Sequence, residues 1–224
     1  TPRFSRKCMD FWPIDLNCLL YKYETDIALS AKILKDNSKY NLWINKSEQR
    51  KTRINKYLWS ERKGFYYDYN FYKNKLGTVN SLAGYFAMWA GVASKIQAVR
   101  MVKNLDKFEK TGGLTTTTKS IVDMSIFGSV PTQWAYPNGW APLHYIVIEG
   151  LEKYGYHEEA KRIALKWIKT NTDWYIEHKE FLEKYNVVKP KKHPLDGVYP
   201  TQTGFGWTNG VFDKLCHTYI DGDS

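Results

Sequence analysis

The stretch QWAYPNGWAPLHYIVIEGL, residues 133–151, joins a cluster of aromatic rings to the start of a helical pattern. Its first eight residues hold two tryptophans, a tyrosine, a proline and a glycine. From Pro142 onward the apolar residues recur with helical spacing, and proline is favoured in the first turn of a helix. We therefore predict a helix over residues 142–155, with a flat and rigid aromatic surface at its beginning.

Helical periodicity recurs along the rest of the chain, whereas the alternation typical of strands is scarce. Further helices are predicted over residues 13–34, 45–60, 81–105 (as two helices), 158–185 and 207–220. Ser47 is the candidate N-cap of the helix over residues 45–60. The predicted buried face of the helix over residues 13–34 consists of Leu16, Leu19, Leu20, Tyr23, Ile27, Ala28, Ala31 and Leu34. The chain is therefore predicted to be all-α.

The connections between these helices are of two kinds. Some are brief and polar, and others are longer and rich in aromatic residues and glycine: RKGFYYDYNFYKNKLG, KTGGLTTTTKS, GSVPTQWAYPNGWAP and DGVYPTQTGFGWTNG. Alternating short and long connections are what antiparallel helix hairpins need when all their long loops open onto one face. We expect a functional site on that face.

The charge of the chain does not point to a nucleic acid. The formal net charge is +10 over 224 residues, which would suit a polyanion if the cations were clustered. They are scattered instead, and the densest group, Lys189–Lys192, is short and interrupted by Pro190. Charge in solvated loops is therefore the favoured interpretation.

Neither a membrane nor a cofactor is indicated. No apolar run approaches the length of about 20 residues that crosses a bilayer. The three cysteines have neither the spacing of a zinc site nor the even count of a disulfide framework. This cysteine usage mildly favours a reducing compartment, such as the cytoplasm, and we predict no metal and no organic cofactor.

Aromatic rings beside amides suit a carbohydrate, because the apolar faces of a pyranose stack on rings while its hydroxyls need donors and acceptors. The two ring-rich loops supply both kinds of side chain: Gln133, Trp134, Tyr136, Asn138, Trp140, Tyr199, Gln202, Phe205, Trp207 and Asn209. Rings beside glycine and proline can equally well close the ends of helices. Composition alone supports both interpretations.

Hydrolysis of a glycosidic bond needs one carboxylic acid and one carboxylate. The carboxylates near the aromatic loops are Glu149, Glu152, Glu180, Glu183 and Asp196. Glu149 and Glu152 belong to the solvated face of a predicted helix. Glu183 differs from them, because the predicted helix ends there and the second aromatic loop follows.

The opening stretch resembles the Q-W-D-x-P-N-G/A-W-x-P signature of trehalases, the glycoside hydrolases of family 37. The resemblance continues, in the family's order, through five further segments: PIDLN (13–17), YLWSERKGFYYDY (57–69), GGLTTTT (112–118), LEKYNV (182–187) and YPTQTGFGWTNGV (199–211). It covers nearly the whole chain, and several motifs in order are far more specific than any one of them.

The resemblance implies an (α/α)6 toroid of antiparallel helix hairpins, of which residues 1–224 would be one domain and about half of the ring. It implies hydrolysis of α,α-trehalose to two glucoses with inversion. Glu183 matches the glutamate of the E-K-Y-D segment that carries the general base. Residues expected to bind the substrate are Trp134, Asn138, Trp140, Tyr199, Gln202, Phe205 and Trp207.

Three departures from the family pattern bear on activity. The signature Asp is Ala135 here, and the Glu of the family's G-E-Y-P stretch is Val198. Neither side chain accepts a hydrogen bond from a sugar hydroxyl. Residues 1–4, TPRF, resemble the end of the family's G-W-D-F-S-S-R-W motif, so the general acid in that motif would precede Thr1.

Two functions therefore remain open. In the first, the chain carries the general base of a trehalase and works with the missing N-terminal half of the toroid, on trehalose or a close analogue. In the second, it is an inactive trehalase-like fragment that binds sugar or regulates. Asp10 and Asp15 are the nearest carboxylates that could replace the acid, although Asp15 lies where a carboxylate favours a helix N-terminus.

Overall fold

The structure is a computed structural model that describes residues 7–119, 133–197 and 199–221. The segment 1–4 and Val198, both discussed above, lie outside the described residues. The chain divides into two compact units, the first being Thr1–Val79 with Ala83–Val102 and the second Asn80–Leu82 with Lys103–Ser224. Each unit is described by itself, and the assignment of residues 1–224 to a single domain stays a prediction.

The first unit combines helices with short antiparallel strands. Its helices are η1 (Lys7–Asp10), α1 (Ile14–Ile33), α2 (Asn37–Tyr57), α3 (Phe86–Trp89) and α4 (Lys95–Val102), with η2 (Leu82–Tyr85) preceding α3. Its strands are β1 (Phe11–Trp12), β2 (Trp59–Ser60), β3 (Phe65–Tyr66), β4 (Tyr69–Asn70) and β5 (Lys75–Leu76). Strand β4 lies between β1 and β5, and β2 pairs with β3. The two helices predicted over residues 81–105 are confirmed as α3 and α4.

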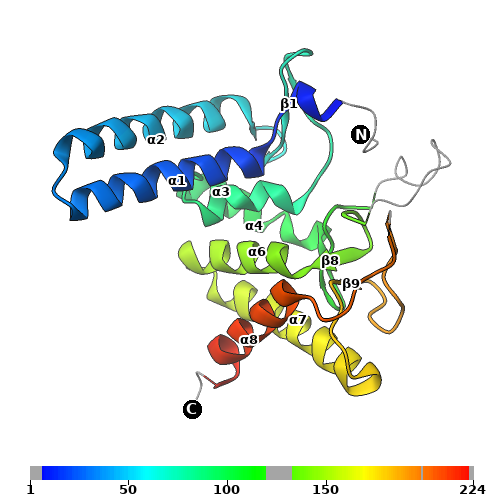
Figure 1. The fold of residues 1–224 in the computed structure, drawn as a ribbon. Coiled ribbons are helices and arrows are strands. Elements are labelled where there is room, and N and C mark those ends of the chain that lie inside the picture. Colours follow the sequence, from blue (N-terminus) through cyan, green and yellow to red (C-terminus); the bar gives the residue numbers. More distant parts are fainter. Residues whose placement is uncertain (1–6, 120–132, 198, 222–224) are drawn as a thin grey trace. The chain divides into compact units, whose positions relative to one another are not determined.

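Helices α1 and α2 form an antiparallel hairpin (Figure 1). The backbone N–H of Ile14 at the start of α1 donates to Asp68 Oδ1 at 2.9 Å. Across the hairpin, Arg50 donates through Nε and Nη2 to both oxygens of Glu24, at 2.9 and 2.8 Å. This two-bond geometry fixes the orientation as well as the pairing of the two side chains.

The predicted start of the second helix is wrong. Helix α2 begins at Asn37 because the preceding Asp36 supplies the cap, its Oδ1 accepting from the Lys39 N–H at 3.0 Å. Ser47 is buried in the middle of the helix, where its hydroxyl donates to the Ile44 carbonyl at 2.8 Å. The N-terminal half of α2 is mostly polar, so apolar periodicity did not reveal it.

The predicted buried face of α1 is wrong at four of its eight positions. Leu16, Tyr23, Ile27 and Leu34 are exposed. Ala28 and Ala31 of the predicted face are buried, as predicted. The other buried residues of the helix, Ile14, Cys18, Tyr21 and Glu24, were not predicted. Helix α1 carries apolar side chains on two neighbouring faces, and periodicity alone does not choose between them.

The second unit contains the helical hairpin of α6 (Ala141–Lys153) and α7 (His157–His178), against both of which α8 (Gly206–Tyr219) packs (Figure 1). Its other elements are η3 (Leu105–Lys107), β6 (Glu109–Lys110), β7 (Gly113–Leu114), β8 (Asn138–Trp140) and β9 (Lys184–Asn186). The predicted helices over residues 142–155 and 207–220 are confirmed as α6 and α8, within two residues at each end.

The helix predicted to continue to residue 185 ends at His178. Lys179 adopts the left-handed conformation with φ 60°, and its N–H donates to the Tyr175 carbonyl at 2.8 Å. A left-handed residue at this position ends a helix. Glu183 therefore lies outside the helix, in the segment that leads into β9.

His144, in the first turn of α6, joins two loops of the second unit. Its Nε2 accepts from the Leu114 N–H at 2.7 Å, and its Nδ1 lies 2.8 Å from the Trp140 carbonyl oxygen. Burial lowers the pKa of His144 to about 4, so the ring is neutral at pH 7 and Nδ1 carries the proton that is donated. The loop of β6 and β7 is thereby held against the beginning of α6.

Candidate active site

The first ring-rich loop contains β8, which pairs with β9 in the segment that carries Glu183. Their antiparallel register places Asn138 opposite Asn186 and Trp140 opposite Lys184. The Glu183 N–H donates to the Gln202 carbonyl at 2.9 Å. Backbone hydrogen bonds therefore gather three segments of the chain around Glu183.

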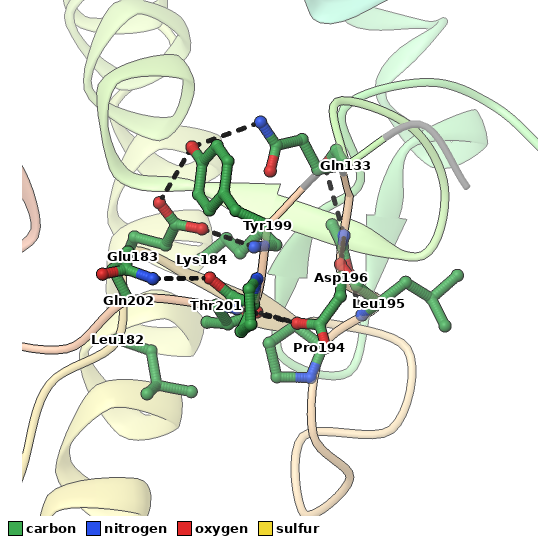
Figure 2. Close-up of polar contacts among 12 residues, drawn as sticks. Gln133, Leu182, Glu183, Lys184, Pro194, Leu195, Asp196, Tyr199, Thr201 and Gln202 are labelled. Atoms are coloured by element: carbon green, nitrogen blue, oxygen red, sulfur yellow. Dashed lines mark hydrogen bonds and ion pairs between the residues drawn. The ribbon is translucent and has the colours of Figure 1, made fainter. Parts of the chain in front are cut away.

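The Glu183 carboxylate is buried and has one partner at each oxygen (Figure 2). The Lys184 ammonium donates to Oε1 at 2.5 Å, and the Tyr199 hydroxyl donates to Oε2 at 3.4 Å. The side chains of Glu183 and Lys184 are both 0% exposed. Glu183 is thus a buried carboxylate beside a buried cation, and not the surface glutamate that a helix end would present.

Four of the predicted aromatic residues form one cluster. The Trp134 and Trp140 rings are stacked, with centroids 3.8 Å apart and planes within 2°. Trp207 meets both rings edge-on, and Phe205 lies 4.8 Å from Trp207. Trp140 is 1% exposed whereas Trp134 is 41% exposed, so only the outer face of this stack is available to a ligand.

Asn138 is fully buried and its side-chain hydrogen bonds go to the backbone. Its Nδ2 donates to the carbonyls of Gln133 and Leu195 at 3.1 and 2.8 Å, and its Oδ1 accepts from the Leu195 N–H at 3.0 Å. These bonds give Asn138 a role in holding two loops together. Its predicted contact with the substrate stays a prediction.

Tyr199 and Gln202 lie on the segment that covers Glu183 (Figure 2). Tyr199 is 40% exposed, and its hydroxyl accepts from Gln133 Nε2 at 3.3 Å. Gln133 Oε1 is buried without a hydrogen-bond partner among the described residues. The exposed Gln202 uses its Nε2 to donate to the Pro200 carbonyl at 2.8 Å.

Three of the other candidate carboxylates, Asp196, Glu152 and Asp15, have hydrogen-bond partners within the protein. Asp196 Oδ1 accepts from both the hydroxyl and the N–H of Thr201 at 2.8 Å, and these bonds lower the pKa of the exposed Asp196 carboxyl. Glu152 accepts from the Tyr219 hydroxyl at 2.6 Å. Asp15 lies in the first turn of α1, as predicted, and its Oδ1 accepts from the Leu16 N–H at 2.7 Å.

Lys184 is the residue of the site that sequence reasoning missed. Its Nζ lies 5.4 Å from the centre of the Trp140 ring and 6.0 Å from that of Tyr199. The signal was its place directly after Glu183, as the second residue of the matched E-K-Y-D segment. A lysine beside a glutamate in the sequence is usually exposed to solvent, and only the structure shows that this one is buried.

Metal and membrane features are not found in the part of the chain that the structure describes. Within residues 7–119, 133–197 and 199–221, no three His, Cys, Asp or Glu side chains are arranged to hold a metal ion. None of the helices described there is both long and apolar enough to cross a membrane.

Comparison with known sequences points to one family. The sequence model of the trehalase family matches residues 1–219. The cytosolic neutral trehalase of Kluyveromyces lactis is 40% identical over 95% of this chain, and that of Neurospora crassa is 37% identical over 95%. The matches cover 31% and 33% of those proteins, so this chain spans about a third of the length of these relatives.

Solved structures agree with this result. The neutral trehalase Nth1 from Saccharomyces cerevisiae aligns over 98% of this chain and 40% of its own, with a TM-score of 0.82 and 33% identity. A mannosylglycerate hydrolase of family GH63 from Thermus thermophilus aligns over 93% of this chain and 45% of its own, with a TM-score of 0.69 and 18% identity. The fold is therefore part of a helical (α/α)6 toroid.

Proposed function

Because this chain belongs to the trehalase family, we propose that it forms the base-bearing part of a site that hydrolyses α,α-trehalose to two glucoses. It spans about a third of the length of its relatives, so the proposal concerns the full-length protein that contains residues 1–224. The trehalases named above are cytosolic, and we propose the same compartment here.

The observation that carries the proposal is the position of Glu183. A carboxylate with no exposed surface lies beside a cluster of aromatic rings, brought there by the pairing of β8 with β9. Burying a charged group is costly, and such groups gather where chemistry needs them. A structural glutamate would be more stable on the surface.

Glu183 serves as the general base in this proposal. It takes a proton from a water molecule, which attacks the anomeric carbon from the face opposite the leaving glucose, so the configuration inverts. The general acid is supplied from outside residues 1–224. The two carboxyl groups of an inverting glycosidase lie about 6.5–9.5 Å apart, which leaves room for the water.

The exposed face of Trp134 is the surface on which a glucose ring stacks. The apolar face of a pyranose packs on an indole, and the buried Trp140 fixes the orientation of Trp134. Phe205 and Trp207 belong to the same aromatic cluster, and Tyr199 and Gln202 lie on the segment that is hydrogen-bonded to Glu183. Because Glu183 has no exposed surface, the Tyr199 side chain has to shift before water reaches the carboxylate.

The exposed apolar side chains of α1 are where we propose that the rest of the toroid packs. Leu16, Tyr23, Ile27 and Leu34 lie at spacings of a single helical face and are exposed. An apolar stripe of this kind is typical of an interface. The proposed partner is the N-terminal part of a trehalase catalytic domain.

A second function is favoured by one observation. Ala135, which replaces the signature Asp, is 7% exposed, and its side chain has no oxygen to accept a hydrogen bond from a sugar. A chain that keeps the aromatic cluster and lacks polar contacts could bind sugar without cleaving it. We therefore retain an inactive sugar-binding module as the alternative.

The test is release of glucose from α,α-trehalose by the full-length protein, followed by proton NMR so that the anomers are seen before they equilibrate. We expect equal amounts of α- and β-glucose as the first products, because inversion at one ring leaves the other unchanged. Glu183→Gln should lower kcat by about 100-fold to 10,000-fold, the usual contribution of a general base.

Glu152→Gln is the matched control, since Glu152 is another glutamate of the second unit, outside the cluster, and should leave kcat unchanged. Release of α-glucose alone would contradict inversion. The alternative function would be established instead if the protein is folded, trehalose quenches its tryptophan fluorescence, and no glucose is released.

A further inference from the structure

We propose that Lys184 is a positioning residue that fixes the Glu183 carboxylate through Oε1 and leaves Oε2 as the oxygen that takes the proton from water. This inference rests on the proposed role of Glu183 as general base. It adds an atom-level assignment within that site and a role for Lys184, to which the sequence analysis gave none.

The position of Lys184 is determined by its surroundings. Its backbone is held in β9 opposite Trp140, and its side chain is 0% exposed. The ammonium lies 5.4 Å from the centre of the Trp140 ring and 6.0 Å from that of Tyr199. A desolvated cation is attracted to aromatic faces at such distances, so the lysine side chain has little freedom to leave the carboxylate.

The two oxygens of Glu183 are held unequally (Figure 2). Oε1 accepts a charge-assisted hydrogen bond of 2.5 Å from Lys184, and such bonds are about twice as strong as neutral ones. Oε2 accepts a bond of 3.4 Å from the uncharged Tyr199 hydroxyl, which is longer than the usual range for hydroxyl donors. A proton transferred to Oε2 therefore displaces the weaker of the two bonds.

The chemical step balances without any change of charge at Lys184. One O–H bond of water breaks and its proton binds Oε2, while the water oxygen forms a bond to the anomeric carbon. The bond from that carbon to the bridging oxygen breaks, and its electron pair stays on the bridging oxygen, which is protonated by the general acid. Glu183 afterwards returns its proton to solvent.

A purely structural role predicts different kinetics. If Lys184 only neutralised a buried charge, its loss would lower stability and the amount of folded enzyme but leave kcat of the folded fraction intact. A positioning role lowers kcat at unchanged KM, because misplacing a reacting group by about 1 Å costs about 100-fold.

The experiment compares Lys184→Met, Glu183→Gln and the double variant in the full-length protein. The quenching of tryptophan fluorescence by trehalose measures the concentration of binding-competent sites, so that kcat refers to folded enzyme. Lys184→Met should lower kcat by about 100-fold and change KM by less than about threefold. In the Glu183→Gln background the same substitution should change the residual rate by less than about threefold, because Lys184 acts only through the carboxylate.

Lys166→Met is the control, because Lys166 on α7 also pairs with a glutamate, Glu109 on β6, at 2.6 Å; it should leave kcat unchanged. If Lys184→Met does not fold, Lys184→Gln replaces it, because its neutral side chain fills most of the space of the lysine. The same changes in kcat and KM are expected.

The outcomes separate the two proposals. If Glu183→Gln abolishes activity while Lys184→Met keeps kcat within threefold, the role of Lys184 is overturned and the base assignment stands. A further large loss when Lys184 is changed in the Glu183→Gln background also overturns it, because Lys184 would then act on the substrate directly. If Glu183→Gln itself is fully active, the proposed function fails.

Discussion

Asn138 and Leu195 exchange a reciprocal pair of hydrogen bonds, from Asn138 Nδ2 to the Leu195 carbonyl at 2.8 Å and from the Leu195 N–H to Asn138 Oδ1 at 3.0 Å. The Asn138 side-chain amide thus makes the two hydrogen bonds, one donated and one accepted, that a backbone peptide group of a neighbouring strand would make in a sheet. The pair ties the segment around β8 to the loop that covers Glu183. Both halves of the amide are needed, since one donates and the other accepts.

The first prediction concerns this amide. Asn138→Asp replaces the donor by an oxygen that faces two carbonyl oxygens, and we expect it to lower the free energy of unfolding by about 3 kcal/mol. Asn186→Asp is the control, because Asn186 Oδ1 accepts from the N–H groups of Val188 and Lys189; the change should be below about 1 kcal/mol. Urea unfolding measures the free energy of unfolding of both variants. Equal decreases in the two variants would contradict the prediction.

The second prediction separates the two stacked indoles. Trp134→Ala should weaken trehalose binding by about tenfold, because the exposed stacking face is lost, with little effect on stability. Trp140→Ala should lower the free energy of unfolding by about 3–5 kcal/mol, because a fully buried ring leaves a cavity. Calorimetric titration and urea unfolding measure these effects. Unchanged trehalose affinity in Trp134→Ala would exclude the stacking surface.

The third prediction concerns Gly113, which has φ +129° and lies against the His144 ring, so a Cβ there would collide with the imidazole. Gly113→Ala should cost about 3 kcal/mol through backbone strain and the loss of the bond between Leu114 and His144.

Gly155→Ala is the matched control for backbone strain alone. Gly155 also has positive φ, +82°, but nothing lies within 4 Å of an added Cβ, so about 1 kcal/mol is expected. Thermal unfolding of the two variants makes the comparison, and a cost at Gly113 no greater than at Gly155 would show that the His144 contact contributes nothing.

The fourth prediction is a pH dependence of stability. Burial lowers the pKa of His144 from 6.5 to about 4 in the folded protein. The unfolded chain therefore binds a proton that the folded chain does not between these values, and stability falls as the pH drops from about 6.5 to about 4. The full loss is about 3 kcal/mol.

His144→Gln should flatten this dependence, since the amide offers both a donor and an acceptor but does not titrate in that range. The measurement is urea unfolding at pH 7 and pH 5. His157→Gln, at an exposed site on α7, is the comparison, and an equally steep decline in His144→Gln and the unsubstituted protein would exclude His144 as its cause.

The sequence by itself determined most of the helices, the family and the identity of the candidate base. Helices α1, α6 and α8 were predictable because their capping and turn residues and apolar spacing act locally. Glu183 was found from the order of the sequence motifs, which can be recognised without knowing any contact in the structure. Helix α2 was missed at its start because its first turn is mostly polar and its cap, Asp36, lay outside the apolar pattern.

Tertiary structure alone decided how Glu183 is held. The register of β8 with β9 depends on hydrogen bonds between segments far apart in the chain, and no local pattern encodes which residues face each other across it. This pairing places Lys184 against Trp140, buries an ion pair that looks like an ordinary surface pair in the sequence, and turns Asn138 toward the backbone. Burial changes the chemistry of a carboxylate through desolvation and fixed partners, and both are properties of the folded surroundings.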